Sequence, residues 1–314
     1  MKKHRHDYLL TALLAGWLAP VALLCLFVSC SGGKSEVEAE RVRNFVYMAG
    51  ESGSTTTTAT IWRNGLRQSL GNGYAMSVFI SGNDVYAAGR SGSSSSAYAA
   101  LWKNGNIKNL GAGVACSVFV SGNDVYVAGY DGSNAVLWKN DIPRVLGSGR
   151  AYSVFVSGGD VYVVGYVGSS SSNYRATLWK NNEEAVPLDP GEARSVFVSG
   201  NVAYVAGFNS SHAILWKNGV PENLAMKEAH SVYVSGNDVY VAGYEGSDAI
   251  LYNNRSGIRQ NLGPGRARSV YVSGNDVYVA GYTGSSSYSY RAALWKNGVS
   301  QDHDSGVAYS VFVQ

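Results

Sequence analysis

The sequence predicts an all-β fold of the β-propeller class, because two short phrases recur along it at a regular interval. The first phrase reads SVYVSGNDVYVAGY at 231–244, and its copies begin at Ser77, Ser117, Ser153, Ser195, Ser231, Ser269 and Ser310. The second reads LWKNG, and its aromatic residue recurs at Trp62, Trp102, Trp138, Trp179, Trp216, Tyr252 and Trp295. The copies lie 36 to 42 residues apart, close to the length of one propeller blade. Seven copies of each phrase predict seven blades.

Each repeat is expected to hold four short antiparallel strands. Runs such as 117–120 and 124–129 are rich in β-branched and aromatic residues and are bounded by turn residues. Gly122-Asn123 between them is a two-residue hairpin loop. The third strand carries Leu-Trp-Lys and ends in a turn such as Asn104-Gly105, which leads to a short fourth strand at 107–110. Four antiparallel strands in every repeat are typical of a propeller, in which each blade packs on its neighbours.

The two ends of the repeat region complete one another. The last copy stops at 310–314, after a first strand, while the region opens at 44–50 with a second strand that lacks its first. We therefore predict that the ring is closed by pairing of the N- and C-terminal strands, which removes the exposed edges of an open array.

This frame resembles kelch-type blades and the bacterial seven-bladed propeller repeats built on Gly-Asn-x-Val-Tyr-Val-x-Gly. The resemblance covers residues 44–314. It departs from kelch where a pair of glycines would end the second strand, because Gly129-Tyr130, Gly165-Tyr166 and Gly243-Tyr244 stand there instead. The resemblance implies a fold and no particular function, since propellers host many activities.

The N-terminus carries the features of an export signal. Lys2, Lys3 and Arg5 precede an uncharged apolar run at 9–28, so residues 1–29 are expected to be a signal peptide. Phe27-Val28-Ser29-Cys30 resembles a lipobox, which implies lipidation at Cys30. Residues 30–43 are polar and are expected to be a lipidated tether.

The lipidated Cys30 would anchor the chain to a membrane. By resemblance to lipoprotein sorting we expect the cell envelope, at the outer membrane or cell surface, with the periplasm as an alternative. An uncleaved membrane anchor at 9–28 is the other interpretation, because about 20 apolar residues can span a bilayer.

Net charge and the cysteine and histidine content limit the kinds of partner, disulfide and metal site that we expect. Without residues 1–29 the formal net charge falls from +3 to +1, so no nucleic-acid partner is expected. Only Cys116 lies in the repeat region, which excludes an internal disulfide there. His212, His230 and His303 fall at different repeat positions, and no metal spacing or cofactor motif is present. We expect a monomer without a cofactor.

Residues found in most copies are assigned to the fold. The aspartates that follow the first hairpin are expected to serve the turn, the tryptophans to pack between blades, and the lysines after them to form a solvated rim. The positions that vary are different. The residue directly before the repeated serine is Met76, Cys116, Tyr152, Arg194, His230, Arg268 or Tyr309, and two residues earlier it is Tyr74, Val114, Arg150, Glu192, Glu228, Arg266 or Val307.

By analogy with other propellers, both variable positions are expected at the face where the central channel opens. The hypothesis is a binding scaffold for an anionic or glycan ligand, in which arginines bind carboxylate or sulfate and tyrosines stack. The candidate residues are Tyr74, Arg150, Tyr152, Glu192, Arg194, Glu228, His230, Arg266, Arg268 and Tyr309.

Three alternatives stay open. The residues could be ordinary surface groups, with Arg194 paired to Glu192 or Glu228. The protein could be a propeller hydrolase or lyase acting on glycans, with Glu192, Glu228 and His230 as acid and base, although the sequence favours a binding role over an enzyme. It could also be a structural subunit of an envelope assembly, with a protein partner.

Overall fold

The computed structural model describes residues 44–53, 57–93, 96–170, 173–181, 185–286 and 289–314. These residues form an all-β fold without a helix, as the repeats predicted. The expected signal peptide, the lipidation site Cys30 and the tether lie outside the described residues. In the described ranges no helix has the length and apolar character needed to cross a membrane.

The fold contains 24 strands. In chain order they are β1 Val46–Ser52, β2 Thr58–Arg63, β3 Leu66–Ser81, β4 Asp84–Ser91, β5 Tyr98–Lys103, β6 Asn106–Ala112, β7 Val114–Ser121, β8 Asp124–Asp131, β9 Asn134–Lys139, β10 Ile142–Ser157, β11 Asp160–Val167, β12 Arg175–Lys180, β13 Val186–Pro190, β14 Glu192–Ser199, β15 Val202–Phe208, β16 Ala213–Lys217, β17 Val220–Asn223, β18 Glu228–Ser235, β19 Asp238–Glu245, β20 Asp248–Asn253, β21 Ile258–Ser273, β22 Asp276–Thr283, β23 Arg291–Lys296 and β24 Val299–Val313.

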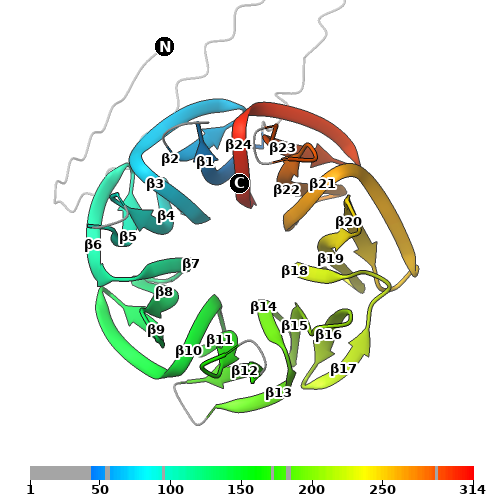
Figure 1. Cartoon of the computed structure of the whole chain (residues 1–314), viewed down its shortest axis with the longest axis horizontal. Helices are drawn as coiled ribbons and strands as arrows, with labels where there is room; N and C mark the ends of the chain where they lie inside the picture. Colours follow the sequence, from blue (N-terminus) through cyan, green and yellow to red (C-terminus); the bar gives the residue numbers. More distant parts are fainter. Residues whose placement is uncertain (1–43, 54–56, 94–95, 171–172, 182–184, 287–288) are drawn as a thin grey trace, which may run out of the picture. The chain divides into compact units, whose positions relative to one another are not determined.

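The strands form antiparallel sheets of 13, 7 and 4 strands, in which hydrogen-bonded neighbours are consecutive along the chain apart from the pair β24 and β1. Figure 1 shows the described part of the chain with its sheets following one another around a common centre. The first strand of each repeat lies nearest that centre, so the residues before each repeated serine are at the innermost strands.

The fourth strand of a repeat is longer than the sequence suggested. β3, β10 and β21 each run for 16 residues, because the fourth strand of one repeat continues directly into the first strand of the next. In β10 the continuation passes through Gly147 and Gly149, both at φ 139°, which lets the chain turn from one sheet to the next while both halves keep their partners. β24 joins the two in the same way over 15 residues, so the fourth and first strands are continuous at four places.

The first and last strands of the described chain are neighbours, as the sequence predicted. β1 pairs with β24 from Val46 opposite Val313 to Ser52 opposite Gly306. Phe45 and Gln314 extend the ladder, since each backbone N–H donates to the carbonyl of the other at 3.0 Å. Figure 1 shows β24 beside β1.

The repeated serine has a role that the sequence did not reveal. In each copy the backbone N–H of the following valine donates to the serine Oγ of the copy before, at 3.1–3.3 Å, and Val78 donates to Ser310 of the last copy. The aromatic residue two positions after each serine contacts its counterparts on both sides, with centroids 4.7–5.1 Å apart: Phe79, Phe119, Phe155, Phe197, Tyr233, Tyr271 and Phe312. Neighbouring repeats are thus joined at their innermost strands.

The tryptophans form the core between repeats, as expected. All six in the described chain, Trp62, Trp102, Trp138, Trp179, Trp216 and Trp295, are at most 2% exposed. Each packs with alanine, valine or leucine side chains of neighbouring strands, for example Trp102 with Ala75 and Val78. Burying such large side chains is the main favourable term in packing the sheets together.

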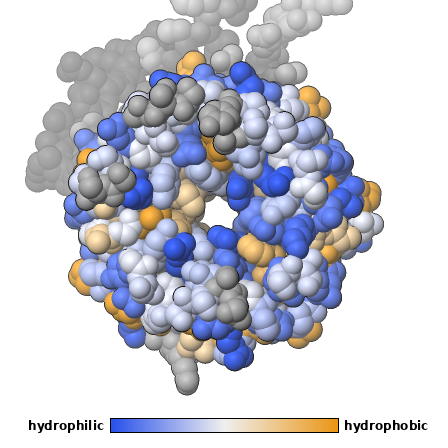
Figure 2. All heavy atoms as spheres, in the orientation of Figure 1, coloured by the Kyte–Doolittle hydropathy of each residue, from blue (hydrophilic) through white to orange (hydrophobic). Residues whose placement is uncertain are grey.

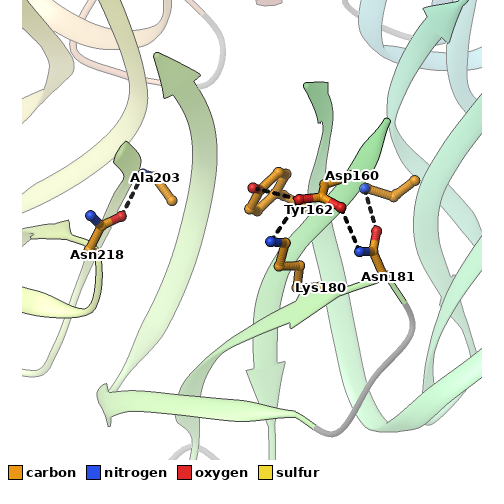
Figure 3. A network of polar contacts seen from close by, with 7 residues as sticks. Asp160, Tyr162, Lys180, Asn181, Ala203 and Asn218 are labelled. Carbon is orange, nitrogen blue, oxygen red and sulfur yellow. Dashed lines mark hydrogen bonds and ion pairs between the residues drawn. The ribbon is translucent and has the colours of Figure 1, made fainter. Parts of the chain in front are cut away.

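The hairpin turns at the other end of the strands are tied by a polar network, drawn in Figure 3. Asp160 accepts a hydrogen bond from the Asn181 side chain at 2.7 Å and pairs with Lys180 at 2.7 Å. Asn181 in turn accepts from the backbone N–H of Val161 at 2.9 Å. The same network recurs around Asp84, Asp124 and Asp276. The turn role of the aspartates is confirmed, and the lysines are about half exposed, as expected, and are also ion-paired.

Candidate functional site

The candidate residues directly before the repeated serines are the extra residues of β-bulges. In the repeat at 231, Ala229 lies opposite Gly243 and Ser231 lies opposite Ala242, so His230 between them has no cross-strand partner. The same register shift occurs in every copy and leaves unpaired Met76, Cys116, Tyr152, Arg194, His230, Arg268 and Tyr309. Bulges re-aim a side chain and are frequent beside functional sites. We call this end of the strands the bulge face.

The bulge explains the repeated glycine of the second strand. A Cβ on Gly243 would lie 2.0 Å from the carbonyl oxygen of Glu228, far inside van der Waals contact. Gly281 stands in the same relation to Arg266, at 1.9 Å. The glycine therefore allows the two backbones to approach at the bulge, while the bulged side chain itself is free to vary.

The bulge face has an apolar and a charged part. Val114, Cys116 and Val307 are buried, at 6–7% exposed, and the other candidate residues are partly exposed. Burial raises the pKa of the Cys116 thiol to about 12, so this thiol is neutral. Figure 2 shows an opening at the centre of the described part of the molecule, with hydrophilic and hydrophobic residues both at its rim.

Arg194 is held by three neighbours. Its guanidinium lies 4.1 Å from the ring centroid of Tyr152 and 5.2 Å from that of Phe208, and it pairs with Glu192 at 2.7 Å. The local pairing with Glu192 that the sequence left open is therefore present. The Nε atom of Arg194 is buried without a hydrogen-bond partner in the described structure, as is Nε of Arg268.

Arg150 and Arg266 occupy the position two residues before the bulge, in different repeats. The guanidinium of Arg150 lies 4.3 Å from the ring of Tyr130, and that of Arg266 lies 3.8 Å from the ring of Tyr244. Neither forms an ion pair with a carboxylate of the described residues. The rings of Tyr130 and Tyr244 thus support the two arginines.

His230 is the most enclosed titratable group of the bulge face. Its side chain is 8% exposed, stacks on Tyr244 with centroids 5.8 Å apart, and has its Nε2 3.2 Å from Nη1 of Arg268. Burial first, then the charges of Arg268 and Arg194, hold the pKa of His230 well below its usual 6.5. The imidazole is therefore neutral, and its Nε2 accepts a hydrogen bond from Arg268.

A neutral His230 whose Nε2 is engaged by Arg268 is a poor general acid. Glu228 lies 3.6 Å from the same nitrogen, and Glu192 is paired with Arg194. These contacts favour positioning of arginines over acid and base catalysis by Glu192, Glu228 and His230.

Tyr309 and Tyr74 form a separate part of the face. The Tyr309 hydroxyl donates to Oε1 of Glu51 at 3.0 Å, and the Tyr74 ring lies 6.4 Å from the Tyr309 ring. Burial raises the pKa of Glu51, and the hydrogen bond from Tyr309 opposes that shift. Burial also raises the pKa of Tyr74 to about 12, so both hydroxyls are neutral donors.

Sequence reasoning missed one set of residues on this face. They follow the second-strand glycine and lie opposite the position two residues before the bulge: Glu51, Arg90, Tyr130, Tyr166, Phe208, Tyr244 and Tyr282. The signal was available, because Gly-Tyr in place of a glycine pair was the feature that departed from kelch blades. It was treated as a departure in fold, whereas the aromatic rings contact the candidate arginines.

No group of three or more metal-ligating side chains occurs among the described residues. One cavity of about 200 Å³ includes a candidate residue, Arg150, together with Tyr166 and Tyr174. Two larger cavities, of about 300 and 400 Å³, are lined by Ile258 and Ile142 with their neighbours and contain none of the candidates.

The comparisons with known proteins address the fold. Residues 112–136, 190–215 and 264–284 match the LVIVD repeat. Each match includes a bulge and the second strand after it. LVIVD repeats are of the β-propeller type. A search of curated proteins finds none that matches this chain.

Solved structures with the same kind of fold come from several bacteria. A Bacteroides uniformis protein provisionally named a 6-phosphogluconolactonase is 15% identical, with 86% of this chain and 99% of that chain covered and a TM-score of 0.53. A Bacteroides fragilis protein of the same provisional name is 12% identical, with 86% and 98% covered and a TM-score of 0.51. A puromycin-hydrolyzing peptidase of Mycobacterium tuberculosis is 11% identical, with 81% and 53% covered and a TM-score of 0.52. At these identities the likeness is one of fold, and the chain is a repeat protein of β-propeller type.

Proposed function

We propose that the described strands form a closed ring of seven blades, each of four antiparallel strands. Three contacts support this: the pairing of β1 with β24, the serine hydrogen bonds that return from Ser310 to Val78, and the aromatic contacts that return from Phe312 to Phe79. Closure pairs the first and last strands, so β1 has no unpaired edge there, and the ring is a rigid frame for a binding face.

The ring is, in this proposal, exported and anchored by a lipid on Cys30 at the outer membrane or cell surface. Support comes from the charged start, the apolar run at 9–28 and the lipobox-like segment before Cys30. Growth of the source cells with a clickable fatty acid tests it. The chain should become labelled, and Cys30→Ser should not. Label retained in Cys30→Ser would contradict lipidation at this residue.

The function we propose is recognition of an anionic ligand, such as an acidic glycan, by the bulge face. The observation that carries the proposal is the state of its four arginines. The guanidinium groups of Arg150, Arg194 and Arg266 lie 3.8–4.3 Å from the centroid of an aromatic ring, and among the described residues only Arg194 has a carboxylate partner. Arg268 contacts the neutral imidazole of His230, which carries no negative charge to balance the guanidinium.

Cations held in this way keep donors available for a carboxylate or sulfate. Stacking fixes the guanidinium plane without using its N–H groups, so little conformational entropy is lost when a ligand binds. The buried Nε atoms of Arg194 and Arg268 also lack a partner, and a bound anion would satisfy such donors. A charged, partly buried and pre-ordered cluster is therefore suited to bidentate recognition.

The experiment is binding of the detergent-solubilised full chain to an array of neutral and acidic glycans. Selective binding to acidic glycans is expected, with loss in Arg194→Ala/Arg268→Ala by at least about tenfold. A matched control, Arg67→Ala/Arg259→Ala, removes two exposed arginines from fourth strands and should bind normally. Equal loss in both variants would show that only net charge matters. No binding to any glycan would overturn the proposal and leave a protein-binding or structural envelope subunit.

A further inference from the structure

Two places on the bulge face carry the same four-residue arrangement. Each consists of an arginine two residues before a bulge, its cross-strand tyrosine, a tyrosine directly before the third strand, and a tyrosine from the preceding repeat. The first assembly is Tyr130, Arg150, Tyr166 and Tyr174, and the second is Tyr244, Arg266, Tyr282 and Tyr290. They lie three repeats apart, at the repeats that begin at Ser153 and Ser269.

The geometry of the two assemblies agrees. Arg150 lies opposite Tyr166 in the β10–β11 ladder, and Arg266 lies opposite Tyr282 in the β21–β22 ladder. The Tyr166 and Tyr174 rings have centroids 3.9 Å apart, and the corresponding second-assembly rings are 4.1 Å apart. The guanidinium lies over the ring from the preceding repeat at 4.3 Å in the first assembly and 3.8 Å in the second.

Three residues of the first assembly, Arg150, Tyr166 and Tyr174, line a polar cavity of about 200 Å³. The other lining residues are glycines and serines, in the turn at Gly132-Ser133, within β10 at Ser148-Gly149 and directly after β11 at Gly168-Ser169. The sequence repeats most of these small residues around the second assembly, as Gly246-Ser247, Gly265 and Gly284-Ser285, whereas Pro264 stands in place of Ser148.

These groups indicate the class of ligand. Arg150 and Arg266 are partly exposed cations without an ion pair to any described carboxylate, so each favours an anion. Serine and tyrosine hydroxyls around them donate to and accept from sugar hydroxyls. The cavity is smaller than the roughly 300 Å³ at which pockets for drug-sized ligands begin, which suits a single sugar residue.

We propose that the two assemblies are equivalent subsites, each of which binds one acidic sugar residue of the uronate kind. The carboxylate would lie at the arginine and the sugar ring against the tyrosine pair, which is stacked in the first assembly and tilted by 37° in the second. This inference deepens the proposed function and rests on it. Two subsites on one rigid face also let a linear polyuronate engage both at once, which strengthens binding through effective concentration.

The test is calorimetric titration of the detergent-solubilised full chain with D-glucuronate, with D-glucose and inorganic sulfate as comparison probes. We expect two equivalent sites for glucuronate. Arg150→Ala and Arg266→Ala should each leave one site, and the double variant should leave none. Arg259→Ala, an exposed arginine on a fourth strand, is the matched control and should keep both sites.

A second variant tests the tyrosine pairs while both arginines are retained. Tyr174→Ala/Tyr290→Ala removes the outer ring of each pair and should weaken glucuronate binding while circular dichroism stays unchanged. With a linear polygalacturonate, the native chain should bind about a hundredfold more tightly than either single arginine variant. Equal affinity of the native and single variants for the polymer would contradict bivalent binding.

The failures are distinguishable. If acidic glycans bind and only Arg194→Ala/Arg268→Ala abolishes binding, the proposed function stands and the two subsites do not exist. If sulfate and glucuronate bind equally well, the sites recognise charge alone and the uronate assignment is wrong. If no acidic glycan or glucuronate binds, both proposals fall.

Discussion

The two ends of each repeat follow opposite rules. At the turn end, four repeats carry the same aspartate, asparagine and lysine in the same contacts. At the bulge face, the equivalent position holds five kinds of residue in seven copies. Yet the backbone at the bulge is as regular as the turn, with one register shift in every first strand.

The difference shows what each end contributes. At the turns, side chains hold the hairpins, so their identity must be kept. At the bulges, the backbone and the second-strand glycine make the geometry, and the bulged side chain takes no part in the ladder. The bulge position can therefore hold a methionine, as at Met76, an arginine, as at Arg194, or a histidine, as at His230, while the strands stay the same. The bulge face is where a binding function can differ from one repeat to the next.

The largest expected effect is on the stability of the whole fold, after deletion of the end of β24 that pairs with β1. Deletion of residues 311–314 removes Val311 and Val313, each 4% exposed, and Phe312 from the aromatic series. The lost burial is worth about 5 kcal/mol or more, and an unpaired β1 edge would be exposed. Thermal melting should show a sharply lower Tm or aggregation, whereas Gln314→Ala should melt close to the native chain. An unchanged Tm after the deletion would exclude the closed ring.

Replacing one glycine at the bulge face and one glycine at a hairpin turn tests the difference between the two ends of a repeat. Gly281→Ala places a methyl 1.9 Å from the carbonyl of Arg266, so the strands must separate at a cost of about 1–3 kcal/mol. Gly274→Ala, in a turn at φ 59°, meets no atom within 4 Å and costs about 1 kcal/mol through its backbone conformation alone. Urea unfolding should rank Gly281→Ala as the more harmful change, and only that variant should also weaken ligand binding. The reverse ranking would remove the steric account of the bulge.

The smallest effect concerns the turn network. The repeat at Ser195 has Val202 where its neighbour has Asp160, and Figure 3 shows Asn218 bonded to the backbone of Ala203 without the aspartate. Asp160→Ala should lower Tm slightly, and Val202→Asp should raise it by less, because Lys217 is already paired with Glu222.

The ionic role of Asp160 can be checked by following how the drop in Tm of Asp160→Ala depends on pH. Hydrogen bonding from Asn181, then from Lys180, holds the pKa of Asp160 below its usual 3.8. A lowered folded pKa means that the network stabilises the fold above pH 3.8 and is lost as pH falls below it. The Tm difference between the native chain and Asp160→Ala should therefore shrink below about pH 4. A constant difference down to pH 2 would contradict the ionic role of Asp160.

Much of the fold was determined by the sequence alone, because the information is local and is written several times over. The strand alternation, the two-residue turns and the buried tryptophans were all predicted, as was the meeting of residues near 46 and 313. Recurrence at a fixed spacing also separated residues that serve the fold from residues that vary. That separation located the bulge positions before their geometry was known.

Only the tertiary structure decided how those variable residues meet. Stacking of Arg150 on Tyr130 or of His230 on Tyr244 depends on which strands are neighbours and on a register shift of one residue. The neutral state of His230 likewise follows from burial beside arginines of other strands. Sequence patterns report the period of a strand, whereas contacts across repeats depend on backbone positions set by packing and by the approach that a missing Cβ allows.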